Sequence, residues 1–227
     1  GIIDMSVGGS NVESWMPRAS LMNDNLLARY IHSWRQSDFD QDFCRERANK
    51  NTALSTIKYQ RHPYDPSYTY EAGIKHWTHV QLAGILWYQG ESNTHNIEHH
   101  DYLFPRFVQS WRDSFNQHLP FYFVQLSSLN RPSWPYFREA QQKLSRELDA
   151  VYMSPSYDIG DSLDVHPTEK YSIGKRLANL VLKHQHHYHI QADSPFPLEI
   201  SLLDNNIEVL LSNATQLKSV GTDRILE

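Results

Sequence analysis

Cysteine is almost absent from this sequence, because Cys44 is the single one among 227 residues. One cysteine excludes an intrachain disulfide, and it leaves the compartment open because disulfide-free secreted enzymes of this size are common. Cys44 lies within Asp42-Phe43-Cys44-Arg45, where neither a base nor an electropositive setting that would activate its thiol is evident. We therefore interpret Cys44 as a structural residue.

Long apolar runs and an excess of basic residues are missing as well. No apolar stretch reaches the roughly 18 residues that a membrane-spanning helix needs, so we predict no membrane span. The formal net charge is −5, whereas nucleic-acid-binding domains usually present a basic face. We therefore expect no nucleic acid among the partners.

An initiating methionine and a signal peptide are also missing. Residues 1–7 already form an apolar, strand-like run with no polar segment before it. We therefore expect the chain to begin partway through a fold, as a fragment of a longer protein.

Apolar residues are present in sufficient number for a folded core. Hydrophobic residues make up 40% of the chain and aromatic residues 12%, which argues against disorder. The length of 227 residues fits one ordinary domain, or one domain and the beginning of another.

Strand and helix patterns alternate along residues 1–183. This alternation predicts an α/β domain over residues 1–190, with a parallel sheet between helices on both faces. From residue 194 the pattern changes to a β-hairpin, so we interpret residues 194–227 as the beginning of a β-rich appended domain. The expected strands are residues 1–7, 80–86, 121–126, 150–153, 199–203 and 207–211; the main expected helices are residues 18–35, 37–58, 71–78, 102–115, 137–148 and 168–183, and a capping box at Ser10–Glu13 predicts a further helix start.

The stretch Trp87-Tyr88-Gln89-Gly90-Glu91-Ser92-Asn93 follows the apolar run that predicts the central strand. An amide, a carboxylate, a hydroxyl and a second amide occur there within five residues. Open α/β sheets bind ligands at the carboxyl ends of their strands, and Gly90 permits a tight turn or a close approach to a ligand. We interpret this stretch as the floor of an active site; the alternative is a capped strand-to-loop turn.

The other expected strands of the parallel sheet also end in polar loops. These loops are Gly8-Gly9-Ser10, Ser127-Ser128 and residues 158–167. Because the carboxyl ends of parallel strands meet at one edge of a sheet, that edge should collect amides, glycine N–H groups, carboxylates and a histidine.

His166 stands out among these residues as a candidate general base. An imidazole that follows a carboxylate on a loop before a helix suits a base oriented by an acid, and Asp164 and Asp161 compete for the orienting role. The alternative is a surface histidine at a helix start. Arg138, at the beginning of an expected helix, either holds a substrate oxygen or forms an exposed pair with Glu139.

The remaining histidines suggest surface roles. His99 and His100 are expected on a solvated helix surface. The tract at the end of the last helix is expected either to place cations near the helix C-terminus or to form a solvated tail. A metal site in that tract would require carboxylate or cysteine partners, which we do not find nearby, so we predict neither a metal nor a cofactor. The tract consists of His184, His186, His187 and His189.

Four motifs together resemble the sialate O-acetylesterases, which belong to the wider SGNH-hydrolase group. The resemblance extends from Gly1 to about Leu180, and the hairpin after residue 194 is similar to the β-domain that follows the catalytic domain there. It implies a three-layer, flavodoxin-like SGNH-hydrolase domain. The motifs are residues 87–93, Trp15-Met16 after Gly8-Gly9-Ser10, Phe137-Arg138-Glu139-Ala140-Gln141, and residues 158–161 with Asp164-Val165-His166-Pro167.

The resemblance implies hydrolysis of O-acetyl esters of sugars, sialic acids in particular, through an acyl-enzyme formed on serine. It assigns Gly9 and Gln89 to the oxyanion hole and His166 to the base. Asn93 and Arg138 complete the expected oxyanion and substrate-binding set, and Glu91 is expected to support the loop. The resemblance also favours an extracytoplasmic location, which could be periplasmic, secreted or lysosomal.

Two departures from the family pattern matter. The family's nucleophile lies in a Gly-Gln-Ser-Asn-Met motif on a strand before the part matched here, and this sequence lacks that motif. We therefore expect the domain to lack its first strand, the serine to lie in a missing N-terminal segment, and the chain alone to be inactive. Members of the group often carry aspartate three residues before the histidine, where this chain has Leu163, so the orienting acid stays open between Asp164 and Asp161.

Two other functional classes remain as alternatives. A non-catalytic glycan-binding protein could keep the same fold and pocket without the nucleophile. A metal-dependent deacetylase would need a cluster of histidine and aspartate ligands at the sheet edge.

Overall fold

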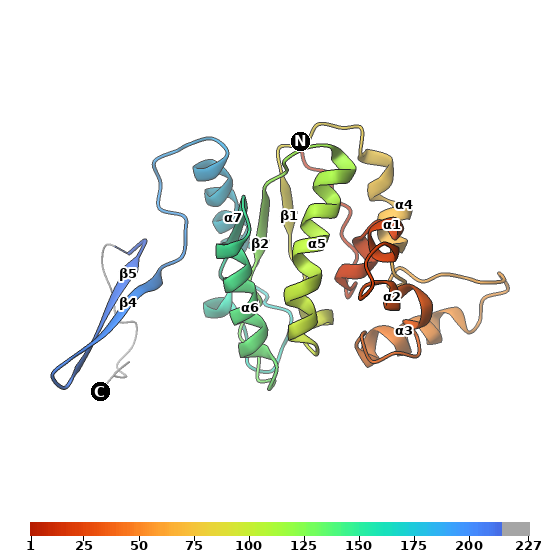
Figure 1. Cartoon of the computed structure of the whole chain (residues 1–227), viewed down its shortest axis with the longest axis horizontal. Helices are drawn as coiled ribbons and strands as arrows, with labels where there is room; N and C mark the ends of the chain where they lie inside the picture. The colour runs from red at the N-terminus through yellow and green to blue at the C-terminus, as the bar shows by residue number, and fades with distance from the viewer. Residues whose placement is uncertain (215–227) are drawn as a thin grey trace.

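A parallel sheet forms the centre of the computed structural model, which describes residues 1–214 (Figure 1). Its strands are β1 (Ile85–Trp87), β2 (Phe121–Val124) and β3 (Val151–Ser154), hydrogen-bonded in the order β1-β2-β3. Parallel strands need a long crossover, and a helix follows each of the first two strands before the next one begins. The predicted α/β architecture with a parallel sheet is confirmed.

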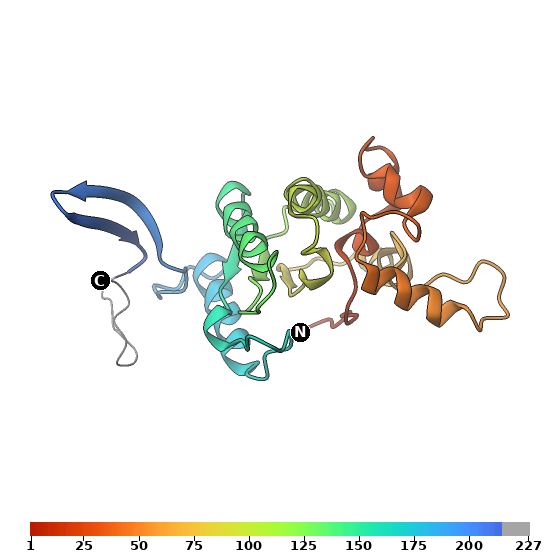
Figure 2. The same cartoon turned by 90° about the horizontal axis from the view of Figure 1, so that it is seen from below.

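The helices α5 (Ile97–Phe115), α6 (Trp134–Glu147) and α7 (Tyr171–His184) enclose the sheet in three layers. Figure 2 shows α5 and α6 on one side of the sheet and α7 on the other. The remaining helices are α1 (Arg18–Met22), α2 (Ala28–Ser33), α3 (Asp42–Thr52) and α4 (Tyr68–Ala72), and the 3₁₀ turns are η1 (Val12–Trp15), η2 (Ile74–Trp77), η3 (Glu91–Asn93) and η4 (Tyr157–Ile159). Within residues 1–214, no helix is both long and apolar enough for a membrane crossing.

Aromatic side chains make most of the contact between α5 and the sheet. The ring of Phe107 lies 4.5 Å from that of Trp87 and 5.7 Å from that of Phe121, measured between centroids. Trp111, one turn further along α5, contacts the same rings and donates from its indole nitrogen to the Trp15 carbonyl at 2.8 Å. This packing holds η1, and with it the Gly8-Gly9 turn before it, against the sheet.

The predicted first strand, residues 1–7, is wrong. Gly1–Val7 forms no strand in the structure, and Ile2 is 86% exposed. An apolar run becomes a strand only where a neighbouring strand satisfies its backbone N–H and C=O groups, and within the described residues β1 pairs with β2 alone.

The predicted capping box at Ser10–Glu13 is also wrong. Asn11, not Ser10, precedes η1, and no side chain caps that turn. The Ser10 hydroxyl instead donates to the Val7 carbonyl at 2.7 Å and accepts from the Trp15 indole at 2.9 Å. Glu13 is fully buried, so its carboxylate binds within the protein interior and not at a solvated helix start.

The predicted solvent exposure of His99 and His100 is wrong as well. Both side chains are buried: α5 packs against α6 beside His100, while the rings of Tyr30 and Phe39 cover His99. The His100 ring lies 4.3 Å from the Phe137 ring, and burial lowers the pKa of His100 to about 3. His100 is therefore a neutral core residue.

The histidine tract after α7 divides into two parts. His184 stacks on Tyr152 at 3.7 Å between ring centroids and bonds the Asp193 carboxylate at 2.7 Å, which corrects the expectation that no carboxylate lies near this tract. The other three histidines, His186, His187 and His189, are exposed as predicted.

The predicted hairpin is confirmed as β4 (Phe196–Leu203) paired antiparallel with β5 (Asn206–Ser212). It forms a separate two-stranded sheet that projects beyond α7 (Figure 1). The appended domain from residue 194 stays a prediction, and its residues 215–227 lie outside the described part of the chain.

We predict that Phe107→Ala lowers the free energy of unfolding by about 3–5 kcal/mol, because it removes a buried ring and leaves a cavity. Tyr136→Ala, at a side chain that is 64% exposed, is the matched control and should change it by about 0.5 kcal/mol or less. Urea denaturation followed by tryptophan fluorescence measures both. Equal effects of the two substitutions would contradict the assignment of Phe107 to the core.

Candidate active site

The loops that follow β1, β2 and β3 pack against one another at the carboxyl edge of the sheet. A Cβ on Gly160 would lie 2.6 Å from the Ser128 nitrogen, so glycine allows the loops after β2 and β3 to touch. The Asn130 N–H donates to the Ser162 carbonyl at 2.8 Å across the same junction. The sequence expectation that these loops meet at one edge is confirmed.

A small apolar cluster connects these loops to the stretch after β1. Leu126, Trp134 and Phe137 form the cluster, and Val165 packs against it. A Cβ on Gly90 would lie 2.8 Å from the Phe137 ring, and Gly90 has a φ of 155°, so two independent constraints require glycine there. The cluster therefore brings the loop of His166 and the turn at Gly90 to the same part of the molecule.

The Gly8-Gly9 turn joins this edge from the N-terminal side. Gly9 has a φ of 75°, and a Cβ on it would overlap the hydroxyl of Tyr64. That hydroxyl donates to the Gly8 carbonyl at 2.8 Å, and the Ser92 hydroxyl donates to the Gly9 carbonyl at 2.8 Å. The turn is therefore fixed from two sides.

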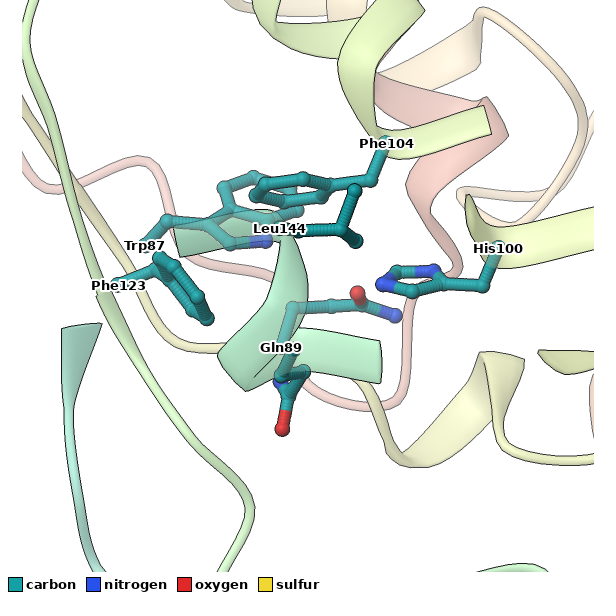
Figure 3. A pocket seen from close by; sticks show the side chains of 7 residues that line it. Trp87, Gln89, His100, Phe104, Phe123 and Leu144 are labelled. Carbon is teal, nitrogen blue, oxygen red and sulfur yellow. The ribbon is translucent and has the colours of Figure 1, made fainter. Parts of the chain in front are cut away.

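Gln89 and Asn93 are buried and bonded to each other. The Gln89 amide nitrogen donates to Asn93 Oδ1 at 2.7 Å and to the Ser10 carbonyl at 3.1 Å, which uses both of its hydrogens. Its Oε1 is buried without a hydrogen-bond partner among residues 1–214. Figure 3 shows Gln89 and His100 lining a pocket with the rings of Trp87, Phe104 and Phe123; this pocket has no room for a water molecule.

His166 and Asp164 lie side by side on the loop after β3. The imidazole Nδ1 is 3.4 Å from Asp164 Oδ1, which also accepts from the His166 N–H at 2.8 Å. Asp161 instead accepts from the Leu163 N–H at 2.7 Å and so shapes the loop. The His166 side chain is 85% exposed, and within residues 1–214 it bonds no serine.

Glu91 lies in the same neighbourhood as His166. Burial raises the pKa of its carboxyl group, while the positive charges of His166 and Lys170 oppose that rise. The Lys170 ammonium lies 4.8 Å from the centroid of the Tyr88 ring. Glu91, His166 and Lys170 therefore come together at the outer side of the site.

Arg138 presents a guanidinium group without an ion pair in the described part of the chain. Its Nε is buried and unpartnered there, its charge lies 5.2 Å from the centroid of the Tyr157 ring, and burial lowers its pKa. Asp158 does not compensate it, because both of its oxygens bind Arg176 at 2.6–2.7 Å.

Sequence reasoning missed three buried polar residues next to the predicted site: Asn11, Glu13 and Asp40. The capping-box pattern assigned Glu13 to a solvated helix start, and no local pattern marks a buried carboxylate. Only tertiary contacts reveal them: Asn93 donates to Glu13, and Asn11 donates to Asp40, which precedes α3.

A family model described as a carbohydrate esterase, sialic acid-specific acetylesterase, matches residues 49–183. The chain belongs to this family. The motif-based resemblance to sialate O-acetylesterases is thereby confirmed, and the match includes the stretch after β1, Arg138 and the loop of His166.

Individual relatives agree with the family. The sialate O-acetylesterases of Mus musculus and Homo sapiens are 26% and 27% identical to the chain over 91% and 78% of its length. The chain spans 43% of the mouse protein and 34% of the human protein. A solved carbohydrate acetylesterase from Xanthomonas citri shares the fold with a TM-score of 0.62 at 24% identity, over 90% of this chain and 41% of that one.

We predict that Glu91 makes the stability of this esterase-family chain fall as pH rises. Its folded-state pKa lies above the ordinary 4.5 because burial disfavours the charged form, so the folded state binds more protons than the unfolded state between the two values. Glu91→Gln replaces the titrating carboxyl group with a neutral amide. Relative to the wild type, the variant should therefore be more stable at pH values above the folded-state pKa of Glu91 than at pH values below the unfolded-state pKa.

Urea denaturation of both proteins below pH 4.5 and at about pH 7.5 tests this linkage. The difference in free energy of unfolding, variant minus wild type, should be more positive at the higher pH. A difference that does not change with pH would contradict it.

Proposed function

We propose that this chain supplies the base, its orienting acid and the oxyanion loops of a carbohydrate O-acetylesterase. Its substrates would be O-acetyl esters of sugars, sialic acids in particular. The observation that carries the proposal is the His166–Asp164 pair, which lies with the Gly90 turn at the carboxyl edge of the sheet, inside the segment matched by the family model.

The chemistry follows the serine-histidine-aspartate route. A serine hydroxyl attacks the acetyl carbonyl while His166 accepts its proton, and His166 then protonates the sugar oxygen that leaves. Water, deprotonated by His166, attacks the acyl-enzyme and releases acetate. Asp164 holds the imidazole through Nδ1 and stabilises its charged form, and Asp161 keeps the loop in shape.

The oxyanion that forms at the acetyl carbonyl needs N–H donors. We assign this role to the Gly9 N–H, which forms no hydrogen bond within residues 1–214, and to the Gln89 amide, which would exchange its longer bond to the Ser10 carbonyl for the oxyanion. Asn93 and Glu91 support the loop, and Arg138 is placed to hold a substrate oxygen.

The nucleophilic serine is assigned to a segment outside these 227 residues. Three serine hydroxyls near the site have other partners: Ser6 donates to Asp4 at 2.6 Å, Ser10 to the Val7 carbonyl and Ser92 to the Gly9 carbonyl. The fraction of the relatives' length that the chain spans, 43% of the mouse protein, is compatible with a further segment. By the same resemblance we assign the protein to an extracytoplasmic compartment.

We predict that His166→Ala lowers kcat by at least about 10³-fold in the enzyme that carries both this chain and the serine, as expected for a triad member. Asp164→Asn should cost more than Asp161→Asn, because Asp164 alone contacts the imidazole. The measurement is acetate release from an O-acetylated sialic acid.

His186→Ala, at an exposed histidine beyond α7, is the matched control and should keep the wild-type rate. A folded His166→Ala enzyme with near wild-type turnover would remove His166 from the mechanism.

We predict that residues 1–227 alone release no acetate from a chromogenic acetyl ester, because no serine hydroxyl within residues 1–214 is hydrogen-bonded to His166. Addition of the serine-bearing segment should restore turnover. Turnover by the chain alone that a serine-directed inhibitor stops would place the nucleophile within the chain. Sugar binding without turnover, with the segment present, would favour the non-catalytic glycan-binding protein.

A further inference from the structure

A network of buried polar side chains lies beneath the Gly8-Gly9 turn. Asn11 and Glu13 are 0% exposed, Asp40 2% and Asn93 5%. The Asn11 amide nitrogen donates to Glu13 Oε1 and to Asp40 Oδ1, both at 2.6 Å, and the Asn93 amide nitrogen donates to Glu13 Oε2 at 3.1 Å. Side chains that are so deeply buried persist only when hydrogen bonds compensate their lost hydration.

Glu13 is the central acceptor of this network. Burial and the neighbouring Glu13 carboxyl group raise the pKa of Asp40 well above its usual value. Glu13 accepts a hydrogen bond on each of its oxygens, so both amide groups present nitrogen to it.

Glu13, as a hydrogen-bond acceptor, determines which way the Asn93 amide faces. With Nδ2 toward Glu13, Asn93 Oδ1 accepts from the Val12 N–H at 3.1 Å and from Gln89 Nε2 at 2.7 Å. The flipped amide would put an N–H group against two other donors and leave Glu13 facing an oxygen. The order of donors and acceptors from Glu13 through Asn93 to Gln89 is therefore fixed.

We propose that Glu13 is a positioning residue for the esterase reaction: through Asn93 it sets the orientation of the Gln89 amide and ties it to the glycine turn. The inference rests on the proposed function, in which Gln89 and Gly9 bind the oxyanion. Glu13 itself contacts neither the substrate nor the reacting atoms.

Exchanging the carboxyl group of Glu13 and the amide group of Asn93 between the two positions tests this role. Glu13→Gln places an amide N–H against one of its two donors, and Asn93→Asp places a second carboxylate against the first. In the double variant, the residue 93 carboxylate accepts from Val12, Gln89 and the residue 13 amide, while the residue 13 carbonyl accepts from Asn11. Every hydrogen bond of the wild type is restored, with the carboxylate at position 93 in place of position 13.

In the enzyme that carries the serine, Glu13→Gln should lower kcat by about 10–100-fold with KM changed less than about threefold, because oxyanion binding matters in the transition state. Asn93→Asp should lower kcat further, and the double variant should recover to within about tenfold of wild type, with a coupling well beyond additivity. Thr69→Val, which removes a buried bond to the neighbouring Ser14 carbonyl, is the matched control; it should lower Tm and keep kcat.

A readout independent of turnover is the side-chain amide NMR signal of Gln89 in the 227-residue chain. Glu13→Gln should shift this signal, and Thr69→Val should leave it in place. Failure of the wild-type enzyme to release acetate would overturn the proposed function, whereas an unshifted Gln89 signal or additive single effects would overturn the role of Glu13.

Discussion

The buried carboxylate of Glu13 is the constraint on which the inner side of the candidate site depends. A buried carboxyl group needs hydrogen-bond partners, and Glu13 obtains its partners from Asn11 and Asn93. The side-chain oxygen of Asn93 accepts from the Val12 N–H and from Gln89 Nε2, which lie 81 and 4 residues away in the sequence. The hydrogen bonds of this one carboxyl group thus determine how the glycine turn and the loop after β1 face each other, whereas the surrounding aromatic core determines only that they are close.

Elements with a regular apolar pattern between clear turn signals could be predicted from the local sequence. Residues 121–126 predicted β2, residues 168–183 predicted α7, and two alternating runs around Asp204-Asn205-Asn206 predicted the hairpin. The loop motifs likewise led to the family, because such motifs are recognised from the order of polar residues along the chain. That order does not depend on how the loops pack. For these parts of the molecule the periodicity of the sequence is sufficient information.

The predictions that failed concern residues whose state is decided by distant partners. Residues 1–7 have strand composition, but no neighbouring strand pairs with them within the described residues. His100 belongs to a helix with a polar first turn, yet it lies against Phe137 of α6, which is 37 residues away in sequence. Glu13 matches a capping pattern and is buried in η1, which packs against α5 and α4. Local sequence propensity carries no information about such contacts. Two of the failed predictions, those for His100 and Glu13, concern residues beside the site.

The two sides of the candidate site differ in how firmly they are held. Gln89 and Asn93 are buried in a continuous network, whereas the His166 side chain is 85% exposed and its loop packs inward through Val165. The imidazole of a triad works best where water is excluded, since an exposed base exchanges its hydrogen bonds with solvent. Under the proposed mechanism, water must therefore be displaced from His166 by the serine-bearing segment and the acetylated sugar. The inner side is already buried, and there only the Gln89 bond to the Ser10 carbonyl has to be exchanged for the oxyanion.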